Sequence, residues 1–115
     1  MALGIQIPSG STNGKLVKVA ATATAGTLIH TAVSGTSSYD EVWLWAANND
    51  TSARELTIEW GGTTSPDDLI KVSLSAKGGL VLVVPGVRIQ NGLAIRAFAS
   101  AANVVNVVCN VNRSS

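Results

Sequence analysis

The chain has 115 residues, of which 46% are hydrophobic and only 13% are charged. This length suits one domain with a single core, and the charged fraction is about half of the usual ~25%. The 8 basic residues are nearly balanced by 7 acidic ones, so the chain lacks the basic excess with which nucleic-acid-binding proteins neutralise phosphates. Its content of apolar residues excludes a disordered chain.

The first 14 residues are rich in Gly, Ser, Thr and Asn, which predicts an extended N-terminal arm before a domain at residues 15–115. Within this arm, Leu3, Ile5 and Ile7 stand at alternate positions. Such alternation lets an extended segment lie as a strand on a neighbouring surface. We therefore include these three residues in a predicted interface.

From residue 15 onward, short β-favouring runs alternate with turn signals rich in Gly, Asn, Ser and Pro. The runs are residues 15–25, 27–33, 41–47, 55–60, 70–75, 80–84, 87–90, 93–99 and 104–111. Eight or nine short strands at this spacing predict an all-β sandwich or barrel. Asn91 and Gly92 separate two apolar runs, and this dipeptide is typical of a tight hairpin.

Most of the predicted strands carry apolar and polar residues at alternate positions, as in 55–60, 70–75 and 105–112. Strands of this kind bury one face and expose the other, which is typical of antiparallel sheets packed on one core. We therefore expect the polar faces of these strands to be solvated.

Two predicted strands lack a polar face. In 41–47, the aliphatic residues share one face, while Trp43 and Trp45 share the other. In 80–84 both faces are apolar, and Val81 and Val83 lie on one of them. Each second face has to be covered, either by a loop or arm of the same chain or by another subunit, because exposed apolar patches of this size usually mark contacts. We assign Trp43, Trp45, Val81 and Val83 to the predicted interface.

Candidate chemical residues are few. His30 stands alone on a predicted strand, and Cys109 alternates with valines on an apolar face, so both are interpreted as structural. Asp67 and Asp68 follow Pro66 in a loop and are expected to form a solvated turn that caps a backbone group. The chain has no nucleophile elbow and no phosphate-binding glycine loop. We predict no catalytic residue, no metal ligand and no cofactor, and hence no enzyme.

The N-terminus has no basic segment followed by a long apolar stretch, so it does not resemble a secretory signal. The longest apolar run, 80–84, is far shorter than the ~20 residues that a membrane helix needs. We expect a protein that is made in the cytoplasm and has no membrane partner. A single cysteine also excludes an internal disulfide framework and a cysteine-rich zinc site.

Three segments carry a resemblance to a group of known proteins. They read TLIHTAVSGTSSYDEVWLWAANND from Thr27, LTIEWGGTTSPDDLI from Leu56 and GLVLVVPGVRIQNGLAIRAF from Gly79. Together they resemble small virion proteins of tailed bacteriophages, of the head-decoration or cement type, over roughly residues 27–113. The resemblance implies a jelly-roll-like β-sandwich that forms a symmetric oligomer and binds the major capsid protein on the head of a phage made in a bacterial host.

The composition of the strands also favours a protein that acts through protein–protein contacts. Surfaces built from Ser, Thr, Asn and Ala suit such contacts, because charged residues are depleted from interface cores. A dimer or a trimer fits the two-fold or three-fold sites of a capsid. Two alternatives remain open, namely a tail or neck component, and a carbohydrate-binding part of a tail fibre in which Trp43, Trp45 and Trp60 contact sugars.

Overall fold

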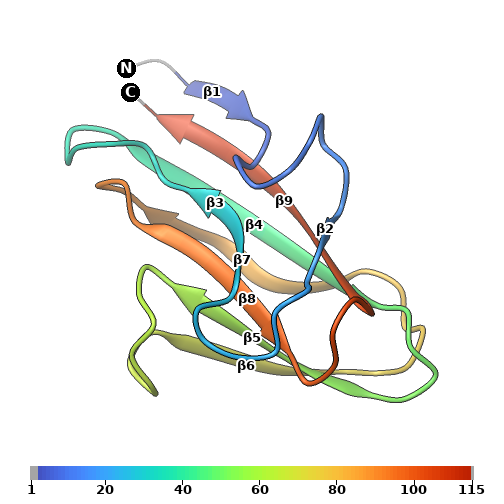
Figure 1. The fold of residues 1–115 in the computed structure, drawn as a ribbon. Helices are drawn as coiled ribbons and strands as arrows, with labels where there is room; N and C mark the ends of the chain where they lie inside the picture. The colour runs from blue at the N-terminus through green and yellow to red at the C-terminus, as the bar shows by residue number, and fades with distance from the viewer. Residues whose placement is uncertain (1–2, 115) are drawn as a thin grey trace.

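The computed structural model describes residues 3–114, and these form β-strands without any helix. The strands are β1 (Leu3–Gln6), β2 (Val17–Lys18), β3 (Thr27–Thr31), β4 (Tyr39–Asn48), β5 (Arg54–Trp60), β6 (Leu69–Leu74), β7 (Val81–Ile89), β8 (Ala94–Ala99) and β9 (Val105–Ser114). They build two antiparallel sheets that pack face to face (Figure 1). The all-β antiparallel sandwich predicted from the turn spacing is confirmed.

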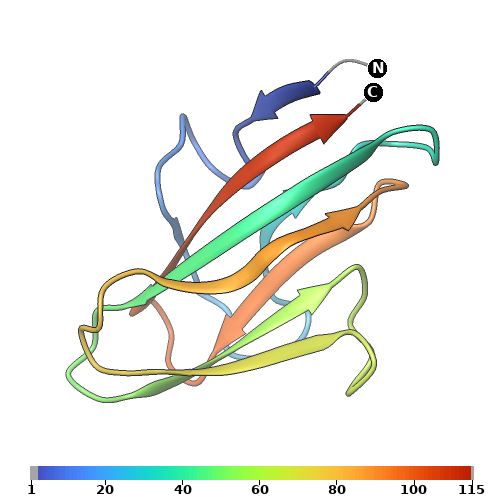
Figure 2. The same cartoon turned by 180° about the vertical axis from the view of Figure 1, so that it is seen from behind.

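The strand order is that of a jelly roll. The larger sheet has the order β1-β9-β4-β7, with β2 also pairing β9, and the smaller sheet has the order β3-β8-β5-β6. If β1 and β2 count as one interrupted strand, the chain has the eight strands and two interleaved Greek keys of that fold. Figure 2 shows β4 and β7 side by side in one layer and β5, β6 and β8 in the other.

The core lies between the two sheets and is aliphatic. Strand β4 supplies Val42, Leu44 and Ala46, each with no exposed surface, and β5 supplies Leu56 and Ile58 from the opposite sheet. Because side chains alternate along a strand, every second residue of β4 from Asp40 to Asn48 is buried. The remaining buried apolar residues are Val17, Val19, Ile29, Ala32, Leu74, Val84, Ile89, Ile95, Ala97, Ala99, Val105, Val107, Cys109 and Val111.

The expected N-terminal arm takes part in the larger sheet. Its residues 3–6 form β1, which pairs antiparallel with the end of β9 in the same chain. Residues 7–16 then leave the sheet edge before β2 returns to β9 with Val17 opposite Val107. The predicted strand over 15–25 is wrong in length, because only β2 has strand geometry there.

The turn at Asn91 and Gly92 forms, but the predicted hairpin does not. Both residues have positive φ, 64° and 67°, as a tight turn of this type requires. However, β7 before the turn belongs to the larger sheet and β8 after it to the smaller sheet. The dipeptide therefore encodes a change of direction between two layers, and its N–H groups bond to the carbonyls of Gly35 and Val33.

The predicted breaks at Pro85 and Gly86 are also wrong. The segments 80–84 and 87–90 form the single strand β7, and Gly86 adopts a φ of 71° within it. Register shifts against β4 on both sides of Trp43 and Leu44 absorb the extra residues. Since β7 is an edge strand, a proline and two bulges are tolerated there.

The outer face of the smaller sheet is not fully solvated. Glu59 has no exposed surface, although the alternation in β5 predicts a solvated side chain. The loop between β2 and β3 covers it, and the Thr24 hydroxyl and the Gly26 N–H donate hydrogen bonds of 2.7 and 2.6 Å to its carboxylate. A loop contact of this kind has no signal in the local pattern of β5.

Candidate functional site

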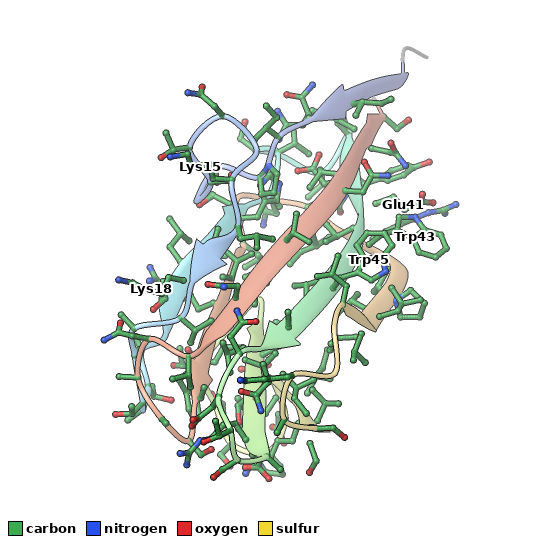
Figure 3. All side chains as sticks on the ribbon, turned by 90° about the vertical axis from the view of Figure 1, so that its right-hand side faces the viewer. Lys15, Lys18, Glu41, Trp43 and Trp45 are labelled. Carbon is green, nitrogen blue, oxygen red and sulfur yellow. The ribbon has the colours of Figure 1, made fainter. Side chains whose placement is uncertain are left out.

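The outer face of the larger sheet is the main candidate surface. Along β4 the aliphatic residues are buried in the core, while Glu41, Trp43 and Trp45 are half-buried on the opposite side. Figure 3 shows both tryptophans leaving β4 on the same side as Glu41. The separation of aliphatic and aromatic faces that the sequence predicts is therefore present.

Neighbouring strands extend this face on both sides of β4. Trp43 lies opposite Asn110 of β9 and Pro85 of β7. Trp45 lies opposite Val108 and Leu82 in the same way. We call Trp43, Trp45, Leu82, Pro85 and Val108 the tryptophan patch. Leu82 is 45% exposed and Pro85 is exposed, so the side of the patch formed by β7 is open.

Val81 and Val83, which we predicted in the interface, do not lie opposite Trp43 and Trp45. Val81 is 37% exposed and lies opposite Ala46, whose side chain is in the core. Val83 is half-buried and packs against the core. The bulge between Leu44 and Trp45 moves Leu82 onto the outer face instead, and strict alternation along 80–84 gives no sign of this bulge.

A polar cluster closes one end of the patch. The carboxylate of Glu41 accepts hydrogen bonds from Trp43 Nε1 at 3.1 Å and from Asn112 Nδ2 at 3.3 Å. The bond from Trp43, followed by that from Asn112, lowers the pKa of Glu41. Arg88 lies opposite Glu41 across the strands, and its guanidinium is 4.8 Å from the centre of the Tyr39 ring. The Trp43 ring is thus fixed in orientation by a charged neighbour.

The predicted arm residues lie at the far edge of the same sheet. Ile5 is 78% exposed and pairs with Asn112, which places it on the outer face, and Ile7 is 57% exposed. The side chain of Leu3 lies outside the described part of the chain. Asn112 of β9 thus lies between Ile5 of β1 and Glu41 of β4.

A small apolar cavity opens where residues 7–16 leave β9. It has a volume of about 150 Å³, and its walls include Ile7, Pro8, Val17, Ile29 and Cys109. An apolar cavity of ~150 Å³ is large enough for a ligand such as benzene. Burial raises the pKa of the Cys109 thiol to about 12, so this sulfur stays protonated and is unsuited to nucleophilic chemistry.

The buried His30 and Asp40 form a cluster with the half-buried Arg113 that the sequence does not reveal. His30 is 1% exposed, and its Nε2 is 2.8 Å from Asp40 Oδ2. Arg113 Nε and Nη2 donate to the two oxygens of Asp40 at 2.7 and 2.9 Å. Burial raises the pKa of Asp40, but the bonds from Arg113 and His30, with one from the Val33 N–H, outweigh it and lower the pKa overall.

This cluster does not have the geometry of a hydrolytic triad, although Ser9 is next to the imidazole. The Ser9 N–H, and not its hydroxyl, lies 3.0 Å from His30 Nδ1. The Ser9 hydroxyl oxygen instead accepts a bond of 2.7 Å from the Thr31 N–H. A triad needs the hydroxyl on the imidazole nitrogen that removes its proton. The interpretation of His30 as structural agrees with this arrangement.

The remaining predicted candidates have local roles. Asp68 accepts a 3.0 Å bond from the Thr64 N–H, which confirms the capped turn expected in this loop, and Asp67 is exposed. Trp60 is half-buried and packs against the core, away from the tryptophan patch. Within residues 3–114, no three acidic, histidine or cysteine side chains meet in a way that would hold a metal ion.

Comparison of the chain with family models, with curated proteins and with solved structures finds no match. Residues 3–114 contain no helix that is long and apolar enough to span a membrane.

Proposed function

We propose that this protein is a non-enzymatic structural component of a tailed-phage virion, of the head-decoration or cement type. It would bind the major capsid protein, and further copies of itself, through the tryptophan patch. The observation that carries this proposal is the pair Trp43 and Trp45, half-buried on an outer sheet face beside the exposed Leu82. Aromatic residues on a surface depleted in charge are the usual anchors of protein interfaces.

Two further arguments support the proposal. The sequence resembles small phage virion proteins, and the jelly roll is a fold that capsid proteins use repeatedly, although a fold alone does not define a function. A decoration protein acts by mass action, since a protein that binds only the assembled shell stabilises that shell. Such a role needs a surface and an oligomer, a dimer or a trimer, but no catalytic group.

The test combines localisation with a pair of variants. Mass spectrometry of separated heads and tails should find the protein with the heads, whereas its recovery with tails would indicate a tail or neck component. Trp43→Asp should weaken co-sedimentation with expanded capsids by about thirtyfold, because a central aromatic anchor is worth about 2 kcal/mol or more. Ser73→Asp, at an exposed position on the smaller sheet, is the matched control and should bind like the wild type.

A carbohydrate-binding role is the second candidate, and one observation favours it. Trp43 and Trp45 lie next to Glu41, Asn110 and Asn112, so an aromatic platform is bordered by carboxylate and amide groups. Stacking of sugars on such rings predicts hits on a glycan array that Trp43→Ala abolishes. An array without hits, together with capsid binding that depends on Trp43, would leave the structural role alone.

A further inference from the structure

His30 connects the N-terminal segment to the core through a bond that fixes its protonation state. The imidazole Nδ1 lies 3.0 Å from the Ser9 nitrogen, and a backbone N–H can only donate. Nδ1 is therefore the unprotonated acceptor. The proton of the neutral ring is on Nε2, which donates to Asp40 Oδ2 at 2.8 Å. Both nitrogens of a ring that is 1% exposed are thus satisfied in only one tautomer.

Ser9 and Gly10 bond to β3, whereas residues 3–6 of the same segment pair with β9. The Thr31 N–H donates to the Ser9 hydroxyl at 2.7 Å, and the Gly10 N–H donates to the Ile29 carbonyl at 2.9 Å. The four residues of β1 end at Gln6, with Ile7 and Pro8 between them and Ser9. A strand of four residues at a sheet edge has little stability of its own. Attachment of the segment therefore depends strongly on the contacts around Ser9.

We propose that His30 is an acid-sensitive latch for the N-terminal segment. When Nδ1 takes up a proton, it becomes a donor that faces the N–H of Ser9, and the hydrogen bond between them is replaced by a repulsive contact. The loop at Ser9 then separates from β3, and β1 is released from β9. Release also removes Ile7 and Pro8 from the wall of the apolar cavity.

The charges around the imidazole mean that protonation breaks the contact at Nδ1 but not the one at Nε2. Asp40 of β4 faces Nε2, and Arg113 of β9 faces Asp40 in turn. From the other packed elements, β8 places the apolar Ile95 opposite His30 and the N-terminal segment places Ser9, neither of which titrates. The bonds from Arg113 and His30 lower the pKa of Asp40, so this carboxylate stays ionised when Nδ1 takes up a proton. An imidazolium therefore stays bonded to Asp40 and loses only the contact with Ser9.

Amide hydrogen exchange measured by NMR on the full chain tests the latch. Spectra are recorded at about pH 7.5 and at about pH 4.5. After correction for intrinsic exchange rates, protection of the Gly10 and Thr31 amides should fall by about tenfold or more at the lower pH, as expected for loss of local hydrogen bonds. Protection of Leu44, in the centre of β4, should not change. Unchanged protection of Gly10 and Thr31 between the two pH values overturns the proposal.

Two substitutions at His30 test the roles of the two ring nitrogens separately. His30→Asn places a carbonyl oxygen near the Nδ1 position, so the acceptor for Ser9 is kept and can no longer be protonated. Protection at Gly10 should then be independent of pH. His30→Gln reaches toward Asp40 but offers Ser9 no acceptor, so protection should be low at both pH values.

A pH effect that persists in His30→Asn contradicts the latch. If a variant does not fold, the ring ¹⁵N shifts of the wild type give an independent check of the tautomer. The experiment does not involve capsids, so its outcome is separate from the proposed function.

Discussion

Replacement of Asp40 by Asn is the most informative perturbation of the fold. Asp40 has no exposed surface and accepts hydrogen bonds from Arg113, from His30 and from the Val33 N–H at 3.1 Å. Asn has the same shape, but one carboxylate oxygen becomes an NH₂ group that faces donors. The substitution thus removes the charge and turns at least one bond into a donor–donor contact.

The loss of stability in Asp40→Asn depends on how exposed the Arg113 charge is once its partner is gone. Removing one partner of a fully buried ion pair costs about 3–5 kcal/mol. Asp40→Asn leaves Arg113, whose side chain is 30% exposed, so we expect a cost of about 2 kcal/mol, still a large part of the ~5–15 kcal/mol that stabilises an ordinary domain. Arg113→Gln should cost less, because the Arg113 side chain is 30% exposed and Asp40 keeps its bonds to His30 and Val33. The expected order of stability is therefore wild type, Arg113→Gln, then Asp40→Asn.

Urea unfolding followed by tryptophan fluorescence measures these differences, with Trp60 packed against the core as a probe.

The dependence of stability on pH gives a second readout. Because the pKa of Asp40 is lowered in the folded protein, its contribution is complete above the unfolded pKa of ~3.9 and is lost as pH falls through the folded value. Asp40→Asn should remove this part of the acid dependence. A loss of less than about 1 kcal/mol, with an unchanged acid limb, would refute the assigned role of the cluster.

Three further predictions concern single positions. The Cys109 thiol, with a pKa of about 12, should react with a thiol-specific reagent at pH 8 only after unfolding, and rapid reaction of the native protein would contradict its burial. Gly10→Ala should lower the urea midpoint and abolish the pH effect on the N-terminal segment, because its Cβ would lie 2.6 Å from the Ile29 carbonyl oxygen. Asn91→Ala should cost about 1 kcal/mol at a φ of 64°, whereas Asn91→Gly should be tolerated, and equal urea midpoints for the two would argue against the turn geometry.

The all-β class and the two faces of most strands could be predicted from the sequence. Alternation along β4 placed Val42 and Leu44 in the core and Trp43 and Trp45 outside, because strand geometry sends successive side chains to opposite faces. The positive φ of Asn91 was likewise predictable from residue type. These are local properties, and each depends on a few consecutive residues.

Which strands share a sheet, and what each outer face contacts, depends on the tertiary structure. The turn at Asn91 joins two different sheets, and the burial of Glu59 depends on a loop 33 residues away. The latch at His30 requires Ser9, 21 residues earlier, and Asp40, which also binds Arg113 over a separation of 73 residues. Jelly-roll connections bring such residues together through long-range pairing, and no periodicity or spacing within one strand specifies a partner at that distance.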